Sequence, residues 1–272
     1  MKVTLYNGKE WAIQKGLKAT VDVLLKDLAT SEMDFVFVLD GYEGTGKSFG
    51  SRGLAMYCAT KLREFGYPET TFTVDDIQFD TQDYVNASIK AGDPESNGRK
   101  IKINVLDEGR NALNKMRRNS KSNILFTNYL SECRAMRQVH IILAPAFHDL
   151  DRYIVFWRTA GVIHFVKKYK PVNDDVGAKL DRGEYRLYST KNFIRACYEL
   201  KGYNYPHKWE ERSTWCPFEV FTDEELKLYN KKKYEATMKK YYEELIEDEN
   251  KDKPKTNVGR PKKQPTLVKI ED

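Results

Sequence analysis

Cysteine and histidine are scarce in this 272-residue sequence, and neither occurs in closely spaced pairs. The four cysteines and four histidines lie far apart, with no Cys-x-x-Cys and no His-x-x-x-His pair. Zinc clusters need ligands at such short spacings, and secreted disulfide scaffolds need many more cysteines. The sequence therefore argues against a zinc site and against a disulfide-stabilised scaffold, and we expect reduced thiols.

Long apolar runs are also missing. The longest, residues 35–39 and 141–147, have the length of strands, whereas a membrane-spanning helix needs about 20 apolar residues. The first residues lack the apolar centre of a signal peptide. We expect a protein without a membrane span that resides in the cytoplasm, or in the host cytoplasm if it is viral.

The main part of the chain has no large excess of either charge. The formal net charge is +6, and residues 253–272 carry +4 of it through six basic and two acidic side chains. Only +2 remains for residues 1–252, so the overall charge says little about a nucleic-acid partner. That question depends on local basic clusters.

The sequence does contain an alternation of strand and helix patterns. Helices are expected at 15–29, 47–64, 82–91, 111–136 and 222–248, and strands at 35–39, 71–74, 101–106, 139–144, 160–166 and 185–189. This βαβα order predicts an α/β fold with a mainly parallel central sheet between helix layers. We expect four segments: a helical entry segment (1–30), a main domain (31–203), a helical C-terminal extension (204–252) and a disordered basic tail (253–272).

A phosphate-binding motif, G-x-x-x-x-G-K-S, lies between the expected strand 35–39 and the expected helix 47–64. Its glycines let successive backbone N–H groups turn toward phosphate oxygens, and the helix start adds its positive dipole end. Its lysine reaches the β- and γ-phosphates, and its serine hydroxyl ligates Mg²⁺. With this context, a chance glycine turn is the weaker interpretation. The predicted nucleotide-binding residues are Gly41, Tyr42, Glu43, Gly44, Thr45, Gly46, Lys47 and Ser48.

A second acidic element follows the expected strand 101–106. Asp107 and Glu108 stand at the end of this apolar strand, as the carboxylates of a Walker B element do. Asp107 is expected to hold Mg²⁺ through the water shell of the ion, and Glu108 to orient and polarise the attacking water. The alternative is a pair of solvated acids. We expect both to lie at a strand end neighbouring that of Lys47, and the adjacent glutamate favours hydrolysis over phosphoryl transfer to a metabolite.

Taken together, these motifs resemble P-loop ATPases that carry a catalytic glutamate. Residues 107–110, 132–137, 139–143 and 149–154 resemble most closely FtsK/HerA-type DNA pumps, including the Zot-like and viral DNA-packaging or assembly ATPases. The resemblance implies a P-loop NTPase fold, a homo-oligomer and DNA as partner. Such pumps usually end the fourth strand with a polar sensor, whereas residues 144–147 read Ala-Pro-Ala-Phe, which leaves His148 or Asp149 as substitutes.

Basic residues near these motifs are candidates for contacts with nucleic acid. A run without acids contains Arg110 and the candidates Lys115, Arg117, Arg118 and Lys121. These side chains would grip DNA phosphates, cover a solvated helix face or reach a neighbour's nucleotide, and the sequence leaves the three open. A ring enzyme also needs an arginine finger, a role for which the sequence offers four candidates: Arg134, Arg137, Arg152 and Arg158.

The tail contains Arg260, Lys262 and Lys263 around a Gly-Arg-Pro sequence that resembles an AT-hook. A flexible, non-specific basic tail is the favoured alternative, and both interpretations favour nucleic acid. Lacking an obvious guanine-specificity motif, the chain is predicted to bind ATP with Mg²⁺. We therefore expect an oligomeric, DNA-associated ATPase motor; the alternatives are a slowly hydrolysing DNA-binding switch and a nucleoside or metabolite kinase.

Overall fold

The computed structural model describes residues 1–31, 33–91, 100–107, 120–166, 168–171, 178–181, 184–188, 191–199, 212–214 and 219–251. The chain divides into two compact units, Met1–Lys231 and Lys232–Asp272. The sheet and the phosphate-binding motif belong to the first unit. Within the described residues, no helix combines the length and the apolar character that crossing a membrane requires.

A seven-stranded sheet in the order β11-β10-β7-β3-β6-β5-β4 forms the centre of the first unit. Its strands are β3 (Phe35–Gly41), β4 (Ile77–Gln78), β5 (Ile103–Leu106), β6 (Val139–Leu143), β7 (Thr159–Phe165), β10 (Glu184–Tyr188) and β11 (Arg212–Thr214). The strands from β7 to β4 are parallel, and β10 and β11 add antiparallel pairs at one edge. The predicted α/β fold with a mainly parallel sheet is confirmed.

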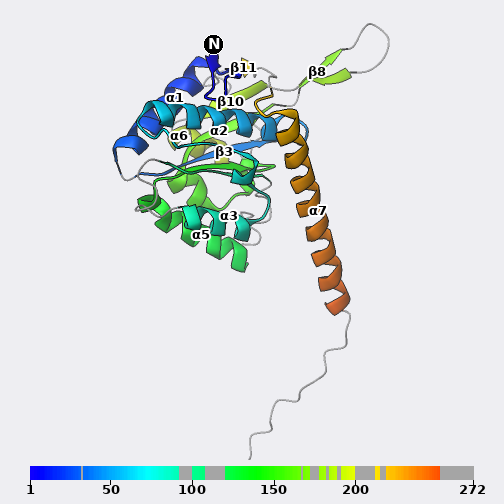
Figure 1. Ribbon diagram of the computed structural model, residues 1–272. Coiled ribbons are helices and arrows are strands. Elements are labelled where there is room, and N and C mark those ends of the chain that lie inside the picture. The colour runs from blue at the N-terminus through cyan, green and yellow to red at the C-terminus, as the bar shows by residue number, and fades with distance from the viewer. Residues whose placement is uncertain are drawn as a thin grey trace, which may run out of the picture. The chain divides into compact units, whose positions relative to one another are not determined.

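Helices cover both faces of this sheet. The described helices are α1 (Lys15–Thr30), α2 (Lys47–Glu64), α3 (Thr81–Ala91), α5 (Lys121–Glu132), α6 (Lys191–Glu199) and α7 (Asp223–Lys251). Figure 1 shows α1 and α2 on one side of the sheet and α3 and α5 on the other. Two small hairpins lie outside the sheet: β1 (Lys2–Thr4) with β2 (Glu10–Ala12), and β8 (Lys168–Pro171) with β9 (Ala178–Asp181).

The two-residue period of β3 divides the hydrophobic core between these layers. Phe35, Phe37 and Leu39 pack into the cluster that contains α1 and α2, whereas Val36 and Val38 pack into the cluster with α3 and α5. A strand buried on both faces reads as a continuous apolar run, which is the pattern of residues 35–39. The phosphate-binding motif therefore follows a fully covered strand in the interior of the sheet.

The expected strand at residues 71–74 is wrong. A 3₁₀ turn at Val74–Asp76 replaces it, and the strand is β4, at Ile77–Gln78. The backbone N–H and hydroxyl of Thr73 both donate to the Asp76 carboxylate, which caps the turn and ends the extended run. The expected helix at 111–136 is described only from residue 120 onward, as α5 followed by a 3₁₀ turn at Cys133–Met136.

Candidate functional site

The loop from Gly41 to Ser48 joins β3 to α2 and has the backbone of an anion cradle. Gly41, Gly44 and Gly46 have φ angles of 131°, 75° and 106°, values that glycine alone adopts readily. At Gly41 an added Cβ would also lie 2.3 Å from the carbonyl oxygen of Phe165 in β7. Because Gly46 caps α2 without a side-chain bond, the first N–H groups of the helix face the loop side, where an anion is favoured.

Lys47, the first residue of α2, folds over this loop. Its ammonium donates to the carbonyl oxygens of Gly41, at 2.5 Å, and Tyr42, at 2.8 Å. The buried hydroxyl of Thr45 donates to the same Tyr42 oxygen at 2.7 Å. The loop therefore holds a positive charge beside its backbone N–H groups, as binding of a triphosphate requires.

Ser48 and Asp107 connect the two predicted motifs. The Ser48 hydroxyl donates to Oδ1 of Asp107 at 3.2 Å across 59 residues of sequence, and Asp107 is 4% exposed. The expectation of neighbouring strand ends is wrong, because β6 lies between β3 and β5. The first turn of α2 spans that extra strand, so the hydroxyl still reaches the carboxylate. A hydroxyl and a carboxylate are hard oxygen donors of the kind Mg²⁺ prefers, so the donor set fits this ion.

Several predicted site residues lie outside the described part of the chain. They are Glu108, Arg110, Lys115, Arg117, Arg118, Arg260, Lys262 and Lys263. Lys121 is described, and it is the exposed first residue of α5, after a Ser120 cap that accepts the N–H of Asn123. Of the substitute sensors, His148 is partly exposed in a 3₁₀ turn at Phe147–Asp149.

The four arginine-finger candidates differ in what they contact. Arg137 donates to the carbonyls of Leu28 and Ala29 at 3.0 and 2.9 Å, and Arg158 forms an ion pair with buried Asp34. Both guanidinium groups are thereby bound within their own chain. Arg134 and Arg152 are exposed. The Arg152 guanidinium lies 5.4 Å from the centre of the Phe156 ring.

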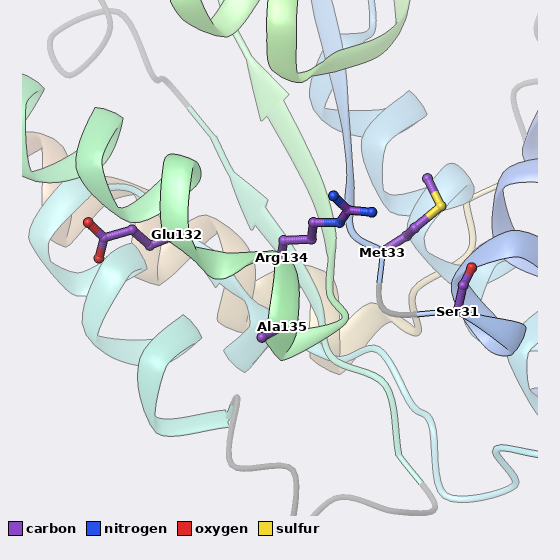
Figure 2. A pocket seen from close by; sticks show the side chains of 5 residues that line it. All are labelled: Ser31, Met33, Glu132, Arg134 and Ala135. Atoms are coloured by element: carbon purple, nitrogen blue, oxygen red, sulfur yellow. The ribbon is translucent and has the colours of Figure 1, made fainter.

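Arg134 lines a pocket of about 450 Å³ together with Ser31, Met33, Glu132 and Ala135. In Figure 2 the Arg134 side chain extends toward Met33, whereas Glu132 points the other way. These residues precede β3 and β6, so the pocket lies at the amino-terminal edge of the parallel strands. The phosphate-binding loop follows the carboxyl end of β3, so the pocket does not belong to the nucleotide site.

A buried polar cluster also lies at that amino-terminal edge. The Cys133 sulfur is 3.2 Å from Oδ2 of Asp34 and 3.7 Å from Nε2 of His140, and these three possible metal ligands lie within 4.8 Å of one another. Sequence spacing gave no sign of this grouping. Arg158 already neutralises the Asp34 carboxylate, so the cluster is satisfied by its own charges. Burial lowers the pKa of His140 to about 4. The smaller effect of Asp34 raises this pKa, and that of Arg158 lowers it.

Asp40, directly before the loop, ties three neighbouring strands together. Its carboxylate, 2% exposed, accepts the backbone N–H of Phe147 at 3.1 Å, and its other oxygen lies 3.0 Å from Nδ1 of His164 in β7. Phe147 follows β6, the neighbour of β3 on the other side. Asp40 thus fixes the start of the phosphate-binding loop. In the sequence, the only indication of this role is a single acid at the end of an apolar strand.

Tyr229 and Arg52 are further site residues that the motifs do not reveal. The Tyr229 hydroxyl donates to Oδ2 of Asp107 across 122 residues. Arg52, 5% exposed on α2, donates to both carboxylate oxygens of Glu219 at 3.2 and 2.6 Å, and its guanidinium lies 4.7 Å from the Tyr229 ring centre. The sequence signal for this contact is Arg52 itself, a charged residue among the apolar residues of α2, and it does not indicate which residue pairs with it.

Comparison with known proteins gives matches among solved structures only: no family model and no curated protein matches the chain. PCH-2 of C. elegans matches over 57% of this chain with 14% identity and a TM-score of 0.39, and the match spans 44% of PCH-2. The N-terminal domain of the zonular occludens toxin from Neisseria meningitidis matches over 68% of this chain and 94% of its own, with 13% identity and a TM-score of 0.39.

A third similar structure is the genome packaging NTPase B204 from Sulfolobus turreted icosahedral virus 2, in complex with ATP-gammaS. It matches over 58% of this chain and 93% of its own, with 13% identity and a TM-score of 0.37. At these values of identity and TM-score, neither a fold family nor an activity follows from the similarity.

Proposed function

We propose that this protein is a Mg²⁺-dependent ATPase whose nucleotide binds between the loop at Gly41–Ser48 and the carboxylate of Asp107. One observation carries the proposal: the Ser48 hydroxyl and the Asp107 carboxylate, from two separate motifs, lie 3.2 Å apart. A helix start, a lysine and this oxygen pair are the parts that a metal-bound triphosphate requires.

The residues would divide the chemistry as follows. The loop N–H groups and Lys47 bind the β- and γ-phosphates and stabilise the charge that develops on the transferred group. Ser48 and Asp107 would hold Mg²⁺, which would supply positive charge to neutralise the phosphate oxygens. Glu108, directly after Asp107 in sequence, orients the attacking water and accepts its proton.

The pair of adjacent acids supports a hydrolase rather than a kinase. Glu108 follows Asp107 directly in the sequence, and a carboxylate beside the magnesium carboxylate can activate a water molecule. A metabolite kinase, the least favoured alternative, has to exclude that water and would yield a phosphorylated product.

We further propose that the ATPase works on DNA as a homo-oligomer, in the manner of a packaging, translocation or assembly motor. Lys115, Arg117, Arg118 and Lys121 would contact phosphates near the site, and the tail residues Arg260, Lys262 and Lys263 would add a flexible basic contact. The alternative is a DNA-binding switch that hydrolyses slowly. It differs from the motor in one measurable respect, since DNA would leave its turnover unchanged.

The test is ATPase turnover with Mg²⁺, measured without DNA, with single-stranded DNA and with double-stranded DNA, alongside a native mass measurement of the assembly with nucleotide. Lys47→Ala should lower turnover by about a hundredfold or more, because a phosphate-binding cation is removed. Lys61→Ala, at the other end of α2, is the matched control and should retain turnover. A fully active Lys47→Ala variant would refute the nucleotide site.

An arginine supplied by a neighbouring subunit would complete the oligomer's site. Arg134 and Arg152 are the candidates that we retain, because their side chains are exposed at the surface, where a neighbouring subunit can reach them. Replacing the finger with alanine should cost about a thousandfold in turnover. Mixing that variant with Lys47→Ala subunits should restore part of the activity, because each subunit then supplies what the other lacks; no recovery for either arginine would exclude both.

A further inference from the structure

The segment Glu219–Lys231, which we call the strap, packs against the magnesium side of the nucleotide site. Val220 and Phe221 are buried, and the Phe221 ring lies 6.0 Å from that of Phe72. Asn7 donates to the Val220 carbonyl at 3.2 Å, and Lys9 donates to that of Phe221. The start of the strap is therefore anchored to the body independently of the nucleotide site.

A second anchor joins the strap to α2, the helix that begins at the phosphate loop. Glu219 receives both donors of the Arg52 guanidinium fork, a geometry that fixes direction as well as distance. The same guanidinium lies 5.4 Å from the Phe221 ring centre and 4.7 Å from that of Tyr229. These contacts place Tyr229, 4% exposed, directly beside Asp107.

The Asp107 carboxylate is consequently held from two sides. Its Oδ1 faces the Ser48 hydroxyl, on α2, and its Oδ2 accepts the hydroxyl of Tyr229, on α7. A hydrogen bond to the outer oxygen of a metal-binding carboxylate fixes its rotation and leaves the inner oxygen available. Tyr229 is placed to do this, since it occupies the oxygen that does not face Ser48.

We propose that Tyr229 is a positioning residue for the magnesium site and that the strap is thereby coupled to nucleotide state. Mg²⁺-nucleotide binding and docking of the strap reinforce each other, because each benefits from the same orientation of Asp107. Such coupling is reciprocal: what the docked strap adds to Mg²⁺ affinity, Mg²⁺ adds to docking of the strap. The inference rests on the proposed nucleotide site and adds to it a route by which the strap responds to the ligand.

Tyr229→Phe tests the coupling, because it removes the hydroxyl and keeps the ring beside Arg52. Affinity for a fluorescent ADP analogue is measured with Mg²⁺ and with EDTA. The affinity gained by adding Mg²⁺ should fall about tenfold in the variant, the lower end of the range for lost second-shell contacts. Affinity in EDTA should stay at the wild-type value. Tyr198→Phe, which removes a hydroxyl bonded to the Leu150 carbonyl at 3.1 Å, is the matched control and should keep the full gain.

Hydrogen exchange of peptides covering residues 219–231 provides a second readout that does not depend on turnover. In the wild type, Mg²⁺-ADP should slow exchange in this segment more than ADP in EDTA does, and Tyr229→Phe should lose the difference. An unchanged Mg²⁺ gain in Tyr229→Phe, or a strap whose exchange ignores Mg²⁺, would overturn the inference alone. A wild type that fails to bind nucleotide under either condition would instead overturn the proposed function, and the inference with it.

Discussion

The buried imidazole of His140 should make the protein sensitive to mild acid. His140 is fully enclosed, with Nδ1 2.6 Å from the Tyr84 hydroxyl and Nε2 facing the Cys133 sulfur and the Asp34 carboxylate. Because Arg158 already pairs with Asp34, little negative charge remains to stabilise a second cation. Burial is the largest cause that lowers the pKa of His140 from 6.5 to about 4.

The sign and size of the effect follow from proton linkage. Between pH 6.5 and about 4 the unfolded chain binds a proton at His140 that the folded chain does not, so the free energy of unfolding falls as the pH falls. At about 1.4 kcal/mol per pKa unit, the full loss from this one group is about 3 kcal/mol. That is a large part of the roughly 5–15 kcal/mol that stabilises a typical domain.

Urea unfolding from neutral pH down to about pH 4 measures this loss, with His140→Gln as the variant that stays neutral. Other titrating groups are common to both proteins, so the difference between the two curves isolates His140. The wild type should lose about 3 kcal/mol more than His140→Gln over this range. Parallel curves for the wild type and His140→Gln would refute the reasoning.

Three further outcomes are expected. Glu108→Gln should bind ATP normally and lower turnover by about a hundredfold or more, because the group that activates water is lost; wild-type turnover would place the base elsewhere. Removal of residues 253–272 should weaken DNA binding and reduce the salt slope by up to about 5, with basal ATPase unchanged; equal DNA affinity would exclude the tail. Gly53→Ala should lower the melting temperature, because a Cβ would lie 2.3 Å from buried Trp11. Overpacking of this kind costs about 1–3 kcal/mol, and we expect that cost to exceed the gain of about 1 kcal/mol in helix propensity. A higher melting temperature in this variant would show that Trp11 moves aside freely.

Local signals in the sequence predicted the elements that carry the motifs. The helix expected at 47–64 has those bounds in the structure, and the apolar run 35–39 is a strand buried on both faces. Both follow from patterns within a few residues, namely hydrophobic periodicity and a glycine-rich junction. The strand expected at 71–74 failed for a physical reason: Thr73 and Asp76 form a local cap, and β4 is too short to show a period.

Contacts between residues far apart in the chain could not be predicted from the sequence. The order of strands depends on packing between whole layers, so the position of β6 between β3 and β5 had no local signature. The contact between Tyr229 and Asp107 joins residues 122 apart, and that between Arg158 and Asp34 joins residues 124 apart. A tyrosine in a charged helix and an arginine before a strand are common in sequences, so neither residue indicates its partner before the fold is known.

The close approach of Gly41 to β7 has a practical consequence for protein engineering. Since a side chain there would collide with the Phe165 carbonyl, the loop at residues 41–48 cannot be transferred to another protein by itself. A graft of residues 41–48 into a new scaffold must bring the backbone of the adjoining strand with it. Libraries that vary this loop should instead change Tyr42 and Glu43, whose side chains are exposed.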